Sequence, residues 1–261
     1  MSALPTDSTP LYRPLAESAA RISLRAASSD AGRASVFEVV SRGDFVPGRL
    51  DQPADSHGNP VLLVLGGSDA WTRGIDHGLA VARIDLPLLG TRQSPKLTDR
   101  LLHGHAAWAS DVALDADTRA LVEEFARQSI SDVVRTLEAL SAEGSVDGSR
   151  VALVGAGIGA SAAAWALPVL PTLRACVLAG PSPGRSDAGL DPVAPLAAAT
   201  LGDIACQVLA PGGGDAAATA LSASLPGSPR FGPLAATSED GDLASSDIDS
   251  ILEFVKAALG R

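Results

Sequence analysis

The stretch RVALVGAGIGASAAA, at residues 150–164, decides how this sequence folds. It opens with an apolar run typical of a buried strand and closes with an alanine-rich run that favours a helix. Three glycines lie between the two runs, at Gly155, Gly157 and Gly159. Glycine permits the positive φ angles and the close backbone contacts that a sharp turn requires. The stretch therefore predicts a strand that turns tightly into a helix.

Similar apolar runs alternate with amphipathic segments along most of the chain, a pattern typical of βα units in a largely parallel sheet. Apolar residues at helical spacing predict helices at residues 117–142 and 246–259. We expect an N-terminal extension at residues 1–20 and a single α/β domain at residues 21–261. Its mostly parallel sheet should have about eight strands, with helices on both faces. The strands expected from the apolar runs are residues 21–27, 33–42, 60–65, 79–86, 150–154, 173–179, 205–209 and 230–235.

The turn at Gly157 fits two motifs of different function. Its glycine spacing matches the G-x-S-x-G nucleophile elbow, whose central residue carries the reactive hydroxyl, and here that central residue is Gly157. Residues 155–160 also fit the G-x-G-x-x-A form of a dinucleotide-binding turn. That motif requires an acidic residue about 20 positions later, and the strand at residues 175–180 ends without a carboxylate. The elbow is therefore the better interpretation.

Residues 125–159 resemble the segment that forms this elbow in the α/β-hydrolase superfamily, in its dienelactone hydrolase and acetyl xylan esterase-like branch. Residues 43–53 are similar to the second strand of that branch, and residues 191–259 are similar to its C-terminal region. Residues 84–92 (IDLPLLGTR) resemble its Asp-Leu-Pro-x-His-Gly loop, with Leu89 at the position of the histidine. The resemblance covers most of the chain and implies the α/β-hydrolase fold.

The resemblance also implies a degenerate catalytic triad. Carried over position by position, Gly157 occupies the nucleophile site, Asp215 fits the acid, and Asp242 or Asp240 falls at the histidine site. No histidine follows His105 in the sequence, although this fold supplies its base after the last strand. A serine nucleophile needs an adjacent base to react at neutral pH. We therefore expect a pseudoenzyme rather than a conventional serine hydrolase.

Gly66, Gly67 and Ser68 follow a strand at the position where this fold builds an oxyanion hole from backbone N–H groups. Together with Gly157 and Ile158, they are the residues that we expect to line a ligand pocket above the strand ends.

Other chemically reactive side chains have structural interpretations. Ser161 lies one helical turn past the elbow and is expected to pack in the helix. Residues 103–105 (His-Gly-His) lack the further ligands that zinc needs and are expected to form a solvated loop. Cys176 and Cys206 lie in apolar runs, where a thiol behaves as a small buried hydrophobe. The acidic run at residues 239–242 fits a surface loop. We expect neither a cofactor nor a metal.

Composition limits the partners of the protein. Its 261 residues carry a formal net charge of −10, which disfavours binding to nucleic acid and to anionic membranes. The N-terminus lacks the apolar segment of a secretory signal, and no run approaches the roughly 18 apolar residues of a membrane-spanning helix. These features predict a soluble, cytoplasmic protein.

Three functions stay open at this point. The favoured one is a pseudoenzyme retained to bind a small molecule, or to associate with another copy or another protein. The second is an enzyme that uses carboxylates such as Asp85, Asp215 or Asp242 in place of serine and histidine. The third is a structural subunit of a complex.

Overall fold

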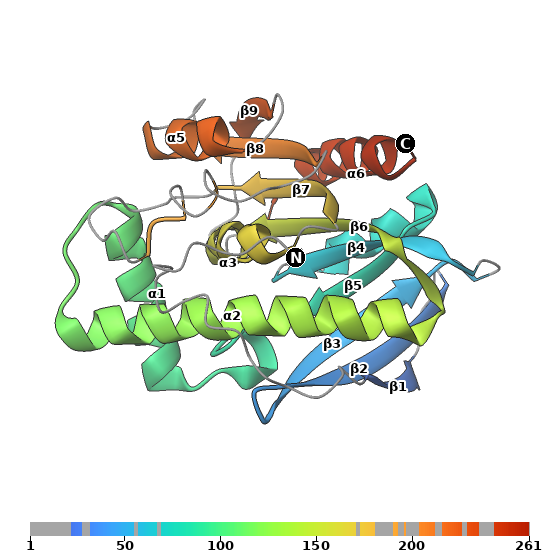
Figure 1. The fold of residues 1–261 in the computed structure, drawn as a ribbon, viewed down its shortest axis with the longest axis horizontal. Coiled ribbons are helices and arrows are strands. Elements are labelled where there is room, and N and C mark those ends of the chain that lie inside the picture. Colours follow the sequence, from blue (N-terminus) through green and yellow to red (C-terminus); the bar gives the residue numbers. More distant parts are fainter. Residues whose placement is uncertain are drawn as a thin grey trace.

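The strands of the computed structural model form one sheet, ordered β1-β2-β3-β5-β4-β6-β7-β8-β9 (Figure 1). Their bounds are β1 Ile22–Ala27, β2 Arg33–Ser41, β3 Asp44–Gln52, β4 Asn59–Leu65, β5 Ala80–Ile84, β6 Val146–Ala156, β7 Leu173–Ala179, β8 Ala205–Pro211 and β9 Arg230–Leu234. The structure describes residues 22–27, 32–54, 57–66, 69–170, 173–180, 190–192, 196, 204–211, 216–225, 229–234 and 243–260.

The sheet has nine strands where about eight were expected. The additional strand is β3, which the resemblance placed at residues 43–53 and the apolar runs did not indicate. Its sequence, DFVPGRLDQ, is interrupted by Pro47 and Gly48, which weaken a strand signal. Pairing with β2 on one side and β5 on the other nevertheless holds it in the sheet.

The sheet divides into an antiparallel part and a parallel part. Strands β1, β2, β3 and β5 pair antiparallel in that order. Every neighbouring pair from β5 through β4, β6, β7 and β8 to β9 is parallel. The expected mostly parallel α/β architecture is confirmed, and β6, which enters the Gly157 turn, lies in the middle of the parallel part.

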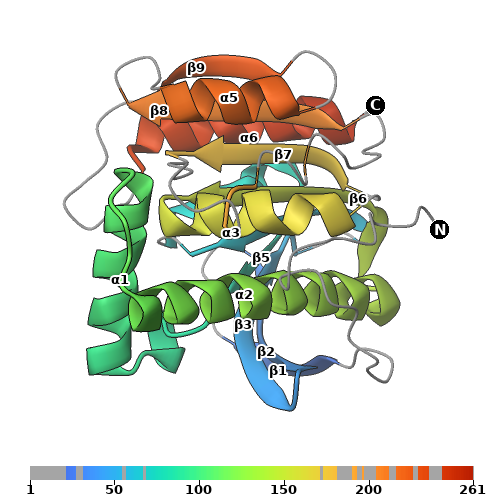
Figure 2. The same ribbon diagram turned by 60° about the vertical axis from the view of Figure 1, so that its left-hand side comes forward.

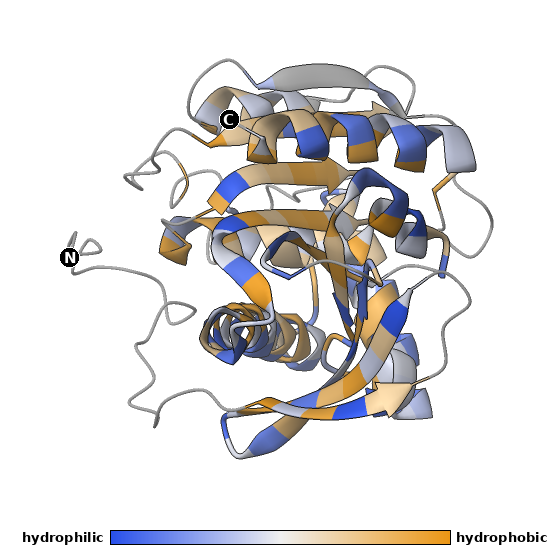
Figure 3. Ribbon diagram, turned by 90° about the vertical axis from the view of Figure 1, so that its right-hand side faces the viewer, coloured by the Kyte–Doolittle hydropathy of each residue, from blue (hydrophilic) through white to orange (hydrophobic). Residues whose placement is uncertain are grey.

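Helices cover both faces of the sheet (Figures 1 and 2). Successive side chains of β4 point to opposite faces of the sheet. Leu63 and Leu65 pack in the apolar cluster on one face, and Leu62 and Val64 pack in the cluster on the other. Figure 3 shows hydrophobic residues along much of the central strands, as burial on both faces requires. The helices are η2 Asp69–His77, η3 Gly90–Arg92, α1 Pro95–Ala109, α2 Ala116–Glu143, α3 Ile158–Ala166, η4 Leu167–Val169, α5 Ala216–Ser224 and α6 Ser245–Leu259.

Helix α2 confirms the expected long helix at residues 117–142. The Asp115 side chain caps its N-terminus by accepting hydrogen bonds from the backbone N–H groups of Asp117 and Thr118. Gly144, at a φ of 73°, ends it in the left-handed conformation that glycine favours. Together with α1, α3 and α5 it covers one face of the sheet, while η2 and α6 cover the other. None of the described helices is long and apolar enough to cross a membrane.

The predicted solvated loop at residues 103–105 is wrong, because these residues belong to α1. Pro95 begins this helix, and Leu101, Gly104 and Trp108 form part of its buried face. Their spacing of three and four residues was a helical signal that the sequence already contained. Figure 2 shows α1 standing beside the end of the sheet toward which β7 points.

Candidate functional site

The turn at Gly157 has the predicted strand–turn–helix geometry. Gly157 joins β6 to α3, with a φ of 53° and a ψ of −121°. Its backbone N–H donates to the Ala179 carbonyl at 2.9 Å, which fixes the turn against β7. A Cβ atom at Gly155 would collide with the Gly159 carbonyl, and one at Gly159 would collide with the Leu65 carbonyl. These close contacts explain the flanking glycines.

Gly157 itself differs from the two glycines beside it. It is exposed, and a Cβ atom added there would meet no other atom within 4 Å. The position therefore has room for a side chain, although its positive φ would strain one. A strained residue raised above the sheet is what a nucleophile elbow provides. In this chain that residue has no side-chain atom that could attack a substrate.

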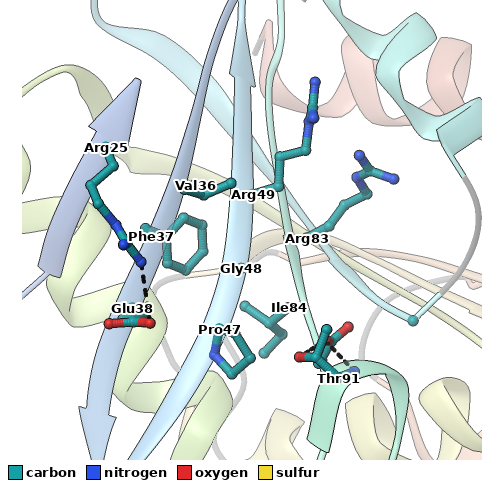
Figure 4. Close-up of a pocket in the computed structure, with 12 residues that line it drawn as sticks. Arg25, Val36, Phe37, Glu38, Pro47, Gly48, Arg49, Arg83, Ile84 and Thr91 are labelled. Carbon is teal, nitrogen blue, oxygen red and sulfur yellow. Dashed lines mark hydrogen bonds and ion pairs between the residues drawn. The ribbon is translucent and has the colours of Figure 1, made fainter. Parts of the chain in front are cut away.

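A groove of about 340 Å³ opens over the antiparallel part of the sheet (Figure 4). Three of its lining residues, Arg25, Arg49 and Arg83, lie in one row across the strands. The row is set by register, because Arg25 pairs with Val36, Val36 with Arg49, and Arg49 with Arg83. The remaining lining residues are Val36, Phe37, Glu38, Pro47, Gly48, Gly66, Ile84, Asp85 and Thr91.

Each of these guanidinium groups is paired with a carboxylate, and Arg25 contacts Glu38 at 3.3 Å. Asp51 is fully buried, and it lies 2.9 Å from Arg49 Nε and 3.5 Å from Arg83. Arg83 also contacts Asp69 at 2.6 Å, and this arginine is the largest cause of the lowered pKa of the Asp69 carboxyl. Because the arginines of β3 and β5 are anchored in this way, their charge is fixed beside the groove.

Asp85, at the edge of the groove, orders the loop after β5. Its carboxylate accepts hydrogen bonds from the backbone N–H and the hydroxyl of Thr91, at 2.8 and 2.6 Å. In the same loop, Arg92 reaches the buried Asp132 at 2.6 Å and Asp44 at 3.0 Å. Burial raises the pKa of the Asp132 carboxyl, while the positive charge of Arg92 opposes this shift. These contacts tie the loop after β5 to β3 and α2.

A serine and a histidine meet between α1 and α3, at a place that the sequence analysis missed. His105 Nε2 lies 2.9 Å from Ser161 Oγ. Ser161 is 3% exposed, which confirms that it packs inside the structure. Burial lowers the pKa of His105 to about 4, so its imidazole is uncharged at neutral pH. The pair is therefore a hydroxyl group hydrogen-bonded to a neutral base.

Aromatic rings surround this pair. The His105 ring lies 5.6 Å from the Trp108 ring, which lies 5.5 Å from the Trp165 ring. His105 and Trp108 are three positions apart on α1, and Ser161 and Trp165 are four apart on α3, so each pair shares one helix face. This spacing was the signal in the sequence, but nothing in it showed that the two faces meet.

Several solved structures of similar shape are esterases. A cold-adapted esterase from an Arctic intertidal metagenomic library matches with a TM-score of 0.63 and 14% identity, over 91% of this chain and 99% of that chain. An acetyl xylan esterase from Paenibacillus sp. R4 matches with a TM-score of 0.61 and 15% identity, over 94% of this chain and 90% of that chain. Acetyl xylan esterase 1 from Thermoanaerobacterium sp. JW/SL YS485 matches with a TM-score of 0.62 and 14% identity, over 91% of this chain and 87% of that chain.

The chain has the α/β-hydrolase fold. The resemblance read from residues 125–159 agrees with these esterase neighbours. At such low identity the likeness establishes the fold and leaves the activity open. No protein-family model and no curated protein matches the sequence.

Several expected members of the α/β-hydrolase site lie outside the described residues. They are the acid Asp215, the alternatives Asp242 and Asp240, and the pocket residues Gly67 and Ser68. Their roles stay predictions.

The described pocket candidates do not all lie together. Gly66 lines the groove, whereas Gly157 and Ile158 are not among its lining residues. Ile158 packs against the apolar cluster that contains α2 and α3. Leu89 also packs against that cluster, so an apolar side chain suits the position where the related loop has histidine.

The three other histidines are not part of the pair formed by His105 and Ser161. His57 is exposed and precedes β4, at the end of the sheet opposite the Gly157 turn. His77 lies 3.3 Å from Glu253 and joins η2 to α6. His103 is exposed, with Nδ1 2.7 Å from the Asp99 carbonyl of its own helix. The contacts of His77 and His103 are therefore structural, and neither histidine lies near the Gly157 turn in sequence.

The two thiols are poor nucleophiles. Cys176 and Cys206 are free, buried and directly opposite each other on β7 and β8. Burial raises the pKa of Cys206 to about 12 and that of Cys176 well above its ordinary value, so both stay protonated. Among the described residues, no group of three or more His, Cys, Asp or Glu side chains could hold a metal ion.

Proposed function

We propose that this α/β-hydrolase-fold protein has lost catalysis at its elbow and binds a small molecule instead. The observation that carries the proposal is Gly157, which keeps the elbow geometry and has no nucleophile. Covalent acyl transfer at this position needs a side-chain oxygen or sulfur. A fold that keeps its shape without this atom can still hold a ligand.

The groove across β1, β2, β3 and β5 is the binding site that we assign to this function. Its volume of about 340 Å³ suits a small molecule. Arg25, Arg49 and Arg83 present three guanidinium groups along one row, and the exposed apolar side chain of Val36 lies in the same row, between Arg25 and Arg49. Guanidinium groups bind carboxylate and phosphate in a fork geometry. The ligand class is therefore a small organic anion with an apolar part.

Benzoate and inorganic phosphate are suitable probes, with binding followed by calorimetry and thermal unfolding. We expect saturable binding of benzoate, weakened about tenfold by Arg25→Gln, since such a charge-assisted contact contributes about 1.4 kcal/mol. The side chain of Arg25 is 67% exposed, so this change should not disturb folding. Arg73→Gln is the control, because Arg73 pairs with Asp249 away from the groove. Equal weakening by both variants, or no saturable binding, would refute this site.

Association with another protein is a second candidate function, supported by an exposed apolar surface. Val40 and Phe45 are direct partners on β2 and β3, and they are 43% and 59% exposed. Val36, on the same face of β2, is 37% exposed. Sedimentation analysis of the wild type and of Phe45→Ser tests this function. Self-association that Phe45→Ser removes would support it, and a monomer at all concentrations would count against a homo-oligomer.

A further inference from the structure

We propose that the ligand of the groove is a zwitterion, whose carboxylate binds beside Arg49 and Arg83 and whose ammonium group binds Asp85. This inference rests on the proposed function, and it narrows the ligand class by adding a cationic group to the organic anion. It follows from the way that strand register divides the charged side chains of the groove into two rows.

An acidic row lies beside the row of arginines. Glu38 comes two residues after Val36 on β2, so the two side chains point to the same face of the sheet. Glu38 pairs with Pro47 of β3, and the Asp85 backbone N–H donates to the Pro47 carbonyl at 3.1 Å. Register therefore places Glu38, Pro47 and Asp85 side by side in this acidic row. Because two residues of a strand span roughly 7 Å, the two rows are separated by about the length of a small molecule.

Asp85 offers an oxygen atom to a cation. Its Oδ2 accepts both hydrogen bonds from Thr91, whereas its Oδ1 accepts none from the described residues. In Figure 4 the side chains of Arg49 and Arg83 extend away from Glu38 and Thr91, so the basic and acidic groups lie toward different ends of the groove. An ammonium group would supply the N–H donor that the second oxygen of Asp85 lacks.

The balance of charge in the groove favours a zwitterion over a simple anion. Carboxylates already pair with the guanidinium groups, because Glu38 contacts Arg25 and the buried Asp51 contacts the other two arginines. Asp85 adds a further negative charge to the lining, and this charge repels a ligand that carries only a carboxylate. An ammonium group on the same ligand replaces that repulsion with a charge-assisted hydrogen bond.

The apolar part of the ligand fits between its two charges. Val36 lies in the arginine row and is 37% exposed, and the half-buried ring of Pro47 lies in the acidic row. Both side chains line the groove and offer an apolar surface that reaches from one row to the other. A flat ring with a charged group at each end matches this arrangement.

The test compares ligands that differ in one group, with affinities measured by calorimetry on the full-length protein. 4-(Aminomethyl)benzoate carries its carboxylate and its ammonium group at opposite ends of a benzene ring, and 4-(hydroxymethyl)benzoate has a neutral hydroxyl in place of the ammonium group. We expect the zwitterion to bind about tenfold more tightly, as one charge-assisted contact allows. Phenylglycine is an isomer whose two charged groups are attached to one carbon atom, so it cannot span the rows and should lack this advantage.

Asp85→Asn separates an ammonium site from a role in folding. The amide oxygen can still accept hydrogen bonds from Thr91, but the negative charge is lost. The variant should bind 4-(aminomethyl)benzoate about tenfold more weakly and benzoate at least as tightly as the wild type, because a repulsive charge has been removed. Damage to the loop would instead weaken both ligands together. Asp99→Asn, which removes an exposed carboxylate from α1 outside the groove, is the control and should leave both affinities unchanged.

Three results would overturn the inference. They are equal binding of the aminomethyl and hydroxymethyl compounds, phenylglycine binding as tightly as 4-(aminomethyl)benzoate, and a parallel loss of benzoate and zwitterion binding in Asp85→Asn. Saturable benzoate binding that Arg25→Gln weakens would support the proposed function in each of these cases. The two proposals can therefore fail separately.

Discussion

Two positions one helical turn apart contrast most clearly in this molecule. Gly157 is exposed, sits in open space and has no side chain, whereas Ser161 is buried and hydrogen-bonded to a base. The first position keeps the backbone geometry of a nucleophile elbow without its chemistry. The second has a hydroxyl group and a neutral imidazole outside that geometry. Backbone shape and side-chain chemistry can therefore separate within one α/β-hydrolase fold.

The largest expected effect concerns the packing of the turn. Gly159→Ala should lower the free energy of unfolding by about 3 kcal/mol or more, because its Cβ atom would collide with the Leu65 carbonyl of β4. Gly157→Ala, which meets only the strain of a positive φ, should cost about 1–2 kcal/mol. Urea unfolding of both variants measures the difference. An equal loss of unfolding free energy in the two variants would mean that Gly159 does not pack against the Leu65 carbonyl.

The next effect is a dependence of stability on pH through His105. The folded pKa of about 4 lies below the ordinary value of 6.5, so between these values the unfolded chain binds a proton that the folded chain does not. The stability that this histidine contributes is complete above pH 6.5 and falls as the pH drops toward 4, by up to about 3 kcal/mol. Unfolding of the wild type and of His105→Gln from pH 4 to pH 8 measures it. A parallel pH dependence in the two proteins would show that His105 is not buried as a neutral group.

A smaller effect is expected from Ser161→Ala. Loss of the hydroxyl removes the hydrogen bond between Ser161 and Nε2 of the half-buried His105. The free energy of unfolding should fall by about 1 kcal/mol. Alanine favours helix and offsets part of that loss. Ser129→Ala is the control, since the Ser129 hydroxyl has no partner among the described residues. If the two variants were equally stable, the contact with His105 would contribute nothing to folding.

The smallest effect is expected from restoring a nucleophile at the elbow. Gly157→Ser should show no burst with 4-nitrophenyl acetate, because a lone serine lacks a base and single triad members recover little activity. Adding Asp242→His should produce a burst if Asp242 occupies the histidine site and Asp215 orients the imidazole. Multiple turnover by Gly157→Ser without this histidine would reveal another base and favour the enzyme hypothesis.

The pattern of the sequence was enough to predict the parallel part of the sheet, the long helix α2 and the glycine turn. These features depend on neighbours in the chain, because apolar spacing and glycine conformation act over a few residues. Strand β3 needed the resemblance, since Pro47 and Gly48 hide its apolar pattern. Helix α1 was mistaken for a loop around His103 and His105, although Leu101, Gly104 and Trp108 have helical spacing.

The sequence by itself determined that Gly157 follows a strand and cannot act as a nucleophile, because glycine has no side chain whatever surrounds it. Only the tertiary structure decided the contact between His105 and Ser161, which are 56 positions apart and lie on separate helices. It also decided the row of Arg25, Arg49 and Arg83, which exists because the register of β1, β2, β3 and β5 aligns them. Residue type and local spacing are properties of the chain, whereas contacts between distant elements depend on how the sheet and its helices pack.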